Sequence, residues 1–200
     1  MKSDFQLDDE RTRLLMIAYI DEVDSPAGRI AFAVTDDGRL LRASFREGAY
    51  ERTLEQEVAD EGYRLDRSTA RTASAREQLE EYAVGDRQAF DLPVVLAGSP
   101  FQQAVWSALM RIPYGETRTY AQLGEMIGRP GAARAVGRAN ATNRIPLIIP
   151  CHRVIGADGS LTGFAGGTHL KVRLLEHEAR ILGRSSPVRM EQPQTLRLAI

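Results

Sequence analysis

The stretch Ile145-Pro146-Leu147-Ile148-Ile149-Pro150-Cys151-His152-Arg153-Val154 contains the only cysteine of the 200-residue chain. A short apolar run, residues 147–149, lies between two prolines, and this pattern predicts a brief buried strand. Because proline lacks a backbone N–H, Pro150 should end that strand. Cys151 is then expected at the end of a rigid element.

The residues that follow Cys151 are typical of a reactive thiol. His152 can accept a proton and Arg153 carries a positive charge, and both groups favour a thiolate over a thiol. The alternative is that Cys151 is simply a small core residue, because free cysteines are often buried. The rest of the chain decides between these two interpretations.

Composition sets broad limits on the class of protein. Two hundred residues suffice for one domain or two small ones. No apolar run approaches the roughly 20 residues that span a bilayer, and the acidic, polar residues 1–10 do not resemble a secretory signal. A single cysteine excludes an internal disulfide and a Cys-rich zinc site, and it suits a reducing cytoplasm. We therefore expect a cytoplasmic protein with no membrane partner and no metal.

Charge is distributed unevenly along the chain. Residues 1–100 carry 13 Lys and Arg against 21 Asp and Glu, whereas residues 101–185 carry 11 against 5. The basic segment also contains the cysteine, which indicates a polyanionic partner there. The alternative is a chance division of solvated surface charge.

The first half of the chain predicts a small antiparallel sheet with two helices. Strands are expected where apolar residues run or alternate, at 14–20, 29–34, 39–45 and 89–92, with turns at 24–28 and 36–38. Helices are expected at 51–59 and 72–82, with inward side chains Leu54, Val58, Leu79 and Tyr82. This half has no set of catalytic groups, so we expect it to support the other half.

Helix start signals follow the boundary at Ala97-Gly98. Ser99-Pro100-Phe101-Gln102 combines an N-cap serine, a proline at the first helical position and a capping-box glutamine. Thr119 and Gln122 form a second capping box, which opens a helix at 120–127. An alanine-rich helix is expected at 132–141, and a turn with glycines joins these two helices in a helix-turn-helix pattern.

The helix at 132–141 combines small residues with two arginines one turn apart, Arg134 and Arg138. Small side chains permit close approach to a large surface, and arginines bind phosphates, so the helix is suited to a DNA backbone or groove. The alternative is close packing inside the protein, which accounts for alanines but not for the arginines.

A glycine-rich loop, 161–167, follows the cysteine and precedes a final helix at 168–182. The chain is thus expected to begin with a disordered leader, residues 1–10, and a supporting α/β domain, residues 11–97. A mainly helical domain with the basic helix and the cysteine is expected at 98–183, and a flexible tail at 184–200.

The motif Pro150-Cys151-His152-Arg153-Val154 resembles the active-site signature of the O6-alkylguanine-DNA alkyltransferases, also called methylated-DNA–protein-cysteine methyltransferases. The likeness extends over residues 99–183, with a weaker match at 24–45. The resemblance implies a ribonuclease-H-like sheet and helix followed by a helical domain with a helix-turn-helix. It also implies direct, stoichiometric transfer of an alkyl group from O6-alkylguanine in duplex DNA, in a suicide reaction without cofactor or metal.

The resemblance further implies roles for individual residues. Cys151 would be the nucleophile and alkyl acceptor, and His152 its base through a bridging water. Glu178 would orient the imidazole, although without the resemblance a solvated helical glutamate is the simpler interpretation. Asn143 would brace the turn before the cysteine. The implied substrate-binding residues are Tyr120, Lys171, Phe164 and Ala165, and the implied DNA-binding residues are Arg134, Arg138, Tyr120, Ala133 and Gln102.

One residue departs from the family pattern. Phe164 occupies a loop position where the family commonly has tyrosine, so a phenolic hydrogen bond to O6 is missing and a modestly slower or differently selective reaction is expected.

The expected partner is alkylated double-stranded DNA, bound by a monomer that is nucleoid-associated on DNA. Activity on O4-alkylthymine and cooperative binding are left open.

Two other classes of protein remain as alternatives. A helix-turn-helix transcription factor would use the arginines but not the Pro-Cys-His-Arg core. A thiol hydrolase would use Cys151, His152 and Glu178 but needs neither the basic helix nor a single turnover.

Overall fold

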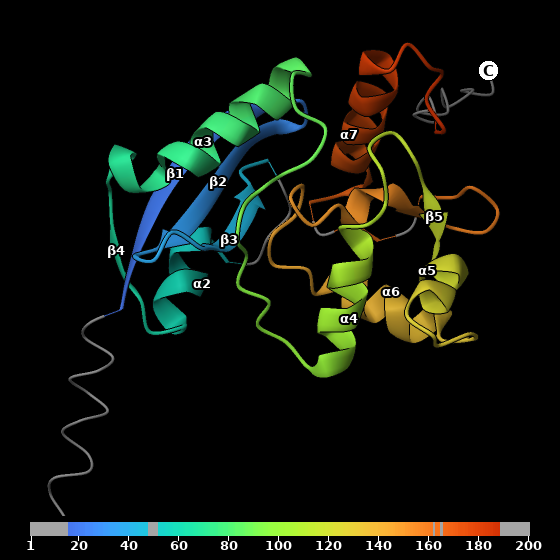
Figure 1. Ribbon diagram of the computed structural model, residues 1–200, viewed down its shortest axis with the longest axis horizontal. Helices are drawn as coiled ribbons and strands as arrows, with labels where there is room; N and C mark the ends of the chain where they lie inside the picture. Colours follow the sequence, from blue (N-terminus) through green and yellow to red (C-terminus); the bar gives the residue numbers. More distant parts are fainter. Residues whose placement is uncertain (1–15, 48–51, 162, 165, 189–200) are drawn as a thin grey trace, which may run out of the picture.

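The computed structural model of the chain describes residues 16–47, 52–161, 163–164 and 166–188 (Figure 1). Four of its strands form one mixed sheet in the order β3-β2-β1-β4. These strands are β1 (Ile17–Ser25), β2 (Gly28–Thr35), β3 (Leu40–Phe45) and β4 (Arg64–Asp66). The antiparallel pairing of β1, β2 and β3 confirms the predicted three-stranded sheet. Strand β4, which pairs parallel with β1, was not predicted.

The two faces of the sheet are covered differently, as the alternation along β2 requires. Ile30 and Phe32 point into the large core that the sheet shares with the rest of the protein. Ala31 and Ala33 point the other way, into a smaller cluster with α2 (Leu54–Asp60). Helix α3 (Thr69–Val84) packs on the face opposite α2, with Leu79 and Tyr82 buried as predicted (Figure 1).

The strand expected at 89–92 is not formed. In this segment only Val94 forms an isolated bridge, to Leu40 at the start of β3. Pro93 lies directly before this bridge and has no backbone N–H to donate, which restricts the segment to a brief contact with the sheet edge.

The second half of the chain is mainly helical, as predicted. Its helices are α4 (Pro100–Leu109), α5 (Tyr120–Met126), α6 (Ala133–Ala141) and α7 (Thr168–Ile181). Both predicted capping boxes are present, with Ser99 and Gln102 at α4 and with Thr119 and Gln122 at α5. Two short parallel strands, β5 (Arg118–Thr119) and β6 (Val154–Ile155), link α5 to the segment after the cysteine.

The apolar run before the cysteine is a tight turn, so the predicted strand at 147–149 is wrong. Leu147 has φ +77°, and the N–H of Ile149 donates to the carbonyl of Ile145 at 3.0 Å. Cys151 then begins a single 3₁₀ turn, η1 (Cys151–Arg153). Prolines on both sides prevent a continuous ladder, and a turn hydrogen bond replaces it.

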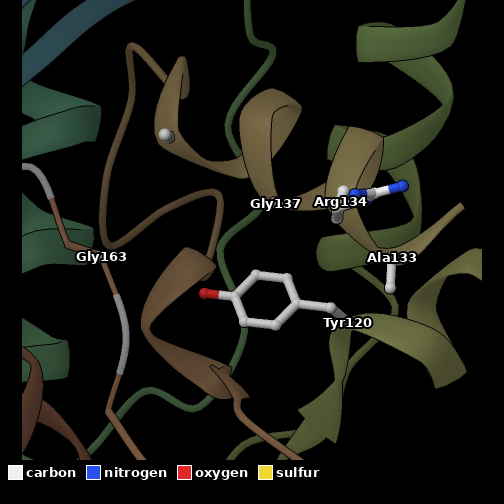
Figure 2. A pocket seen from close by; sticks show the side chains of 6 residues that line it. Tyr120, Ala133, Arg134, Gly137 and Gly163 are labelled. Atoms are coloured by element: carbon white, nitrogen blue, oxygen red, sulfur yellow. The ribbon is translucent and has the colours of Figure 1, made fainter.

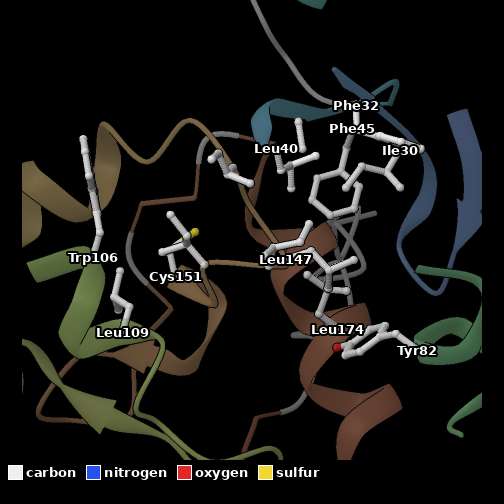
Figure 3. Close-up of a cluster of buried hydrophobic side chains, with 14 of the residues drawn as sticks. Ile30, Phe32, Leu40, Phe45, Tyr82, Trp106, Leu109, Leu147, Cys151 and Leu174 are labelled. Atoms are coloured by element: carbon white, nitrogen blue, oxygen red, sulfur yellow. The ribbon is translucent and has the colours of Figure 1, made fainter. Parts of the chain in front are cut away.

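One large buried cluster runs from the sheet to the helices without a break (Figure 3). It joins Ile30 and Phe32 of β2 to Trp106 and Leu109 of α4, and it also contains Cys151. Two further contacts cross between the halves: the Ala43 N–H donates to the Arg144 carbonyl at 2.9 Å, and Arg144 pairs with Glu61 at 2.7 Å. The two halves are therefore packed on each other over a common core.

The expected leader, residues 1–10, lies outside the described residues, as do positions 14, 15 and 51 of the expected first strand and first helix. At the other end, the expected tail is described only to Val188, which is buried against Val172 and Leu175 of α7. The first part of this segment therefore returns to the protein. No helix among the described residues is long and apolar enough to cross a membrane.

Candidate active site

Cys151 is almost completely buried, with 5% of its surface exposed. Figure 3 shows it between Trp106 and Leu109 on one side and Leu147 on the other. Burial raises the pKa of the Cys151 thiol, while a hydrogen bond with Asn143 and the charge of Lys171 act in the opposite direction. At neutral pH the resting group is therefore a thiol, which needs a base before it can react.

Arg153, which the sequence suggests as a group that favours the thiolate, is paired with Glu178. Its guanidinium donates to the Glu178 carboxylate at 2.9 Å and to the Ile112 carbonyl at 2.7 Å. The cation that acts on the thiol is Lys171. Arg153 is itself buried at the end of the 3₁₀ turn that Cys151 begins.

Asn143 braces the turn that delivers the cysteine. Its Nδ2 donates to the carbonyl of Ile149 at 2.8 Å, and its Oδ1 accepts from the N–H of Ile145 at 3.0 Å. Both ends of the turn are thus tied to one buried amide side chain. The resemblance implied such a bracing position for Asn143, and its part in the reaction stays a prediction.

His152 and Glu178 lie in direct contact although 26 residues separate them. Nε2 of the histidine is 2.8 Å from Oε1 of the glutamate, and both side chains are fully buried. Burial lowers the pKa of His152, and the Glu178 charge opposes this. We take the resting imidazole as neutral, with Nε2–H donating to the carboxylate. Nδ1 then carries the lone pair, and it has no hydrogen-bond partner among the described residues.

The Glu178 carboxylate accepts hydrogen bonds from three other segments of the chain, and we refer to the carboxylate with its donors as the Glu178 centre. Burial alone would raise the pKa of Glu178, but His152 and Arg153 together hold it below its usual range. The carboxylate is therefore an anion with every contact satisfied. Its donors are His152 and Arg153 of η1, Tyr82 of α3 and the backbone N–H of Gly115.

Lys171 is buried on α7, and its ammonium donates to the carbonyl of Val154. Burial lowers the pKa of Lys171 to about 8, and the Cys151 charge acts in the opposite direction. The residue is therefore a buried cation near the sulfur, able to stabilise an anion that forms there.

A cavity of about 390 Å³ opens beside the helices α5 and α6. We call it the α5–α6 groove. Figure 2 shows the Tyr120 ring extending from the start of α5 toward the loop that carries Gly163. Arg134 is exposed at the rim, and Arg138, one turn further along α6, is also exposed. The lining residues are Tyr120, Ala133, Arg134, Gly137, Ala141 and Gly163.

The remaining predicted site residues lie in different surroundings. The side chain of Gln102 caps α4 through the Ser99 N–H at 2.9 Å and donates to the Thr142 hydroxyl at 2.9 Å, so its amide already has partners inside the protein. Phe164 is half-buried and packs on Phe45, with ring centroids 6.2 Å apart. Ala165 lies outside the described residues.

The sequence alone did not predict Tyr82, Gly115 or Arg153 as parts of the Glu178 centre. Tyr82 offered one signal, because a fully buried tyrosine hydroxyl usually finds a hydrogen-bond partner. Nothing in the local sequence indicates which partner that is. Among the described residues, no group of three or more His, Cys, Asp or Glu side chains is placed to hold a metal ion.

Comparison with known proteins places this site in a family. Residues 100–180 match the family described as 6-O-methylguanine DNA methyltransferase, DNA binding domain. The constitutive methylated-DNA–protein-cysteine methyltransferase of Bacillus subtilis (strain 168) is 42% identical over 161 residues, which cover 80% of this chain and 94% of that protein. The methylated-DNA–protein-cysteine methyltransferase of Methanosarcina barkeri (strain Fusaro / DSM 804) is 44% identical over 160 residues, covering 80% of this chain and 96% of that protein.

Solved structures agree with this assignment. The crystal structure of Mycobacterium tuberculosis OGT in complex with DNA matches with a TM-score of 0.71 and 42% identity, covering 82% of this chain and 94% of that one. Similarity of this extent includes both the α/β half and the helical half. The chain therefore belongs to the methylated-DNA–protein-cysteine methyltransferase family.

Proposed function

We propose that this chain repairs alkylated duplex DNA by transferring the alkyl group of O6-alkylguanine to its own Cys151. The observation that carries the proposal is the contact between His152 and Glu178 directly beside Cys151. This contact fixes the imidazole so that Nδ1 is the basic nitrogen, which is the group that a buried thiol needs for activation. A thioether resists hydrolysis, so each molecule reacts once.

The proposed reaction conserves protons. The Cys151 proton passes to Nδ1 of His152 through a bridging water, and Glu178 stabilises the imidazolium that forms. The sulfur attacks the alkyl carbon while the carbon–O6 bond breaks, and the guanine anion leaves. Tyr120 donates to the purine as charge develops, Lys171 stabilises the sulfur anion, and the proton on His152 is finally lost to the departing base or to solvent.

DNA recognition is assigned to the α5–α6 groove. We propose that α5 and α6 form a helix-turn-helix, with the small face of α6, including Ala133, against the duplex. Arg134 fills the space of the extruded nucleotide and Arg138 contacts phosphate. Extrusion costs a few kcal/mol, which these contacts offset. Ala165 offers its backbone N–H to O6, Phe164 forms a wall of the pocket, and Gln102 positions α4 near the backbone.

The proposal extends to the organisation of the chain. Residues 11–97 form a ribonuclease-H-like supporting domain and residues 98–183 the DNA-binding and alkyl-acceptor domain. The chain acts as a monomer without a cofactor, in the cytoplasm and on the nucleoid when bound. Cooperative binding and repair of O4-alkylthymine are extensions that the same assay can include.

Peptide mass spectrometry tests the function. The full chain is incubated with equimolar duplex that contains one O6-methylguanine, with Cys151→Ala protein and unmodified duplex as controls. We expect the Cys151 peptide to gain one methyl group in place of hydrogen, with no more than one methyl per protein molecule. Duplex binding without modification would support a transcription factor, and demethylation over many turnovers would support a thiol hydrolase.

A further inference from the structure

We propose that Tyr82, on helix α3 in the half of the chain without catalytic groups, is a positioning residue for the transfer and acts through Glu178. This inference rests on the proposed function of Cys151. It assigns the α/β half a direct part in the chemistry in addition to support.

The Tyr82 hydroxyl is bonded to the same carboxylate oxygen that holds the imidazole of His152. Its Oη donates to Oε1 of Glu178 at 2.9 Å, and the same oxygen accepts from His152 Nε2 at 2.8 Å. Both side chains of this pair, and Tyr82 itself, are fully buried. A donor on Oε1 restricts where the carboxylate oxygen can lie, and that position fixes the imidazole plane.

The tyrosine ring is itself held firmly. It stacks on Phe90 with centroids 5.4 Å apart, and the Tyr114 ring meets its edge at 5.7 Å. The Tyr82 carbonyl is 3.0 Å from Nε2 of His177 on α7. Ring contacts and a backbone contact therefore locate the hydroxyl without help from Glu178, as a positioning group requires.

The charge state of Tyr82 suits this task. Burial raises the pKa of Tyr82 well above its usual value, and the neighbouring Glu178 charge adds to the effect. The hydroxyl therefore stays protonated and remains a donor throughout the working pH range. Other titratable or charged groups that face this cluster from the surrounding elements are Arg153, Lys171, His177, Arg180 and Tyr114. Cys151 in turn interacts with Lys171.

Loss of the Tyr82 hydroxyl should change the pKa of His152 in a predictable direction. With one donor fewer, the carboxylate attracts the imidazolium more strongly and raises the pKa of His152. Because transfer needs the neutral imidazole, the acid limb of the rate profile should move to higher pH. A tyrosine that only filled space would lower stability without moving this limb.

The chain supplies a matched control in Tyr114. Its hydroxyl is buried but has no hydrogen-bond partner among the described residues, and its ring lies against both Tyr82 and the Arg153 guanidinium. Tyr114→Phe removes a hydroxyl from the same cluster and leaves all donors to Glu178 in place. We expect it to react like the parent.

The experiment measures single-turnover transfer to Cys151 from O6-methylguanine duplex as a function of pH, for the parent, Tyr82→Phe and Tyr114→Phe. We expect Tyr82→Phe to be about tenfold slower at neutral pH, as partners of ligating or catalytic groups commonly are. Its acid limb should shift upward, while Tyr114→Phe follows the parent. Equal profiles for all three proteins would overturn the inference and leave the function intact. A parent that transfers nothing would overturn the function and the inference together.

A second substitution guards against misfolding of Tyr82→Phe. Site-specific 3-fluorotyrosine at position 82 keeps the shape of the ring but makes the phenol a stronger donor. We expect the acid limb to move in the opposite direction, to lower pH. An unmoved limb in the folded, fluorinated protein would also overturn the inference.

Discussion

The Glu178 centre and the α5–α6 groove are built in opposite ways. In the Glu178 centre a fully buried carboxylate receives hydrogen bonds from both halves of the chain. In the groove, by contrast, Arg134 and Arg138 are exposed, and the lining is formed largely of small residues around Tyr120. The Glu178 centre is closed to solvent and its carboxylate is fully hydrogen-bonded, whereas the α5–α6 groove is open to solvent.

This difference separates two requirements of the proposed reaction. Proton transfer needs groups fixed in a water-poor setting, where each hydrogen bond has a large effect. DNA binding needs surface that a large, hydrated and sequence-variable partner can reach. Substitutions in the two regions should therefore differ in kind: those in the centre should alter stability and pH dependence, and those in the groove should alter binding to duplex.

The most severe test of the closed region is Glu178→Gln. It replaces the buried anion by an amide and leaves the Arg153 guanidinium without its counter-charge. We expect the free energy of unfolding to fall by about 3–5 kcal/mol, the range for breaking a buried ion pair. Urea denaturation measures this. Glu176→Gln, on the exposed face of the same helix, should change stability by no more than about 0.5 kcal/mol. Equal effects of the two substitutions would contradict a stabilising role for the buried, hydrogen-bonded carboxylate.

A pH-dependent test concerns Lys171. Its folded-state pKa of about 8 lies below the ordinary value of 10.5, so between these values the unfolded chain binds more protons. The contribution of Lys171 should therefore raise stability as the pH increases through this window, by on the order of 2 kcal/mol between pH 8 and 10. Urea denaturation of the parent and of Lys171→Met at pH 8 and at pH 10 isolates the contribution of Lys171 to stability. Parallel changes in the two proteins would contradict it.

The open region is tested by Arg134→Ala with Arg138→Ala as its companion. Arg138→Ala should reduce the salt dependence of duplex binding by about one unit of slope, because it loses one phosphate-neutralising charge. Arg134→Ala should instead slow transfer from duplex, by about tenfold, since extrusion costs a few kcal/mol. Transfer from a single-stranded oligonucleotide should be unaffected. Similar transfer rates from duplex for both variants would remove the special role of Arg134.

The smallest effect is expected for Phe164→Tyr, where the loop meets the core. A phenol there adds one hydrogen bond to O6, which would increase the single-turnover rate by a few-fold, as expected for a net gain of about 1 kcal/mol. Thermal melting should be nearly unchanged, because the ring that packs on Phe45 is retained. An unchanged rate would show that the missing hydroxyl has no consequence.

Local features of the fold could be predicted from the sequence, and long-range ones could not. The hairpin strands follow from alternation, and the capping boxes at Ser99 and Thr119 follow from residue type and spacing. The turn at Leu147 was missed because an apolar run between prolines does not reveal its own φ angle. Strand β4 was missed because three residues carry too little periodicity.

The same division applies to the candidate site. Cys151 and His152 are adjacent, so their chemistry is visible in the sequence. Glu178 was found only through resemblance to a family, and Tyr82 lies 96 residues from its partner. Gln102 illustrates the converse, because its capping role could be deduced from spacing, while its place in DNA binding stays a prediction. Convergence of distant side chains depends on packing, which no local pattern encodes.

The unbroken core also limits how the protein can be divided. Ile30 and Phe32 of the sheet are buried in the same cluster as Leu109 and Cys151. A fragment with only the helical half would expose to water the apolar side chains that now pack against the sheet, and it would lose the Tyr82 hydroxyl. The helical half is therefore not expected to function as an isolated domain. A shortened alkyl acceptor would need replacement apolar side chains against the helical half and a hydroxyl at the position that Tyr82 now occupies.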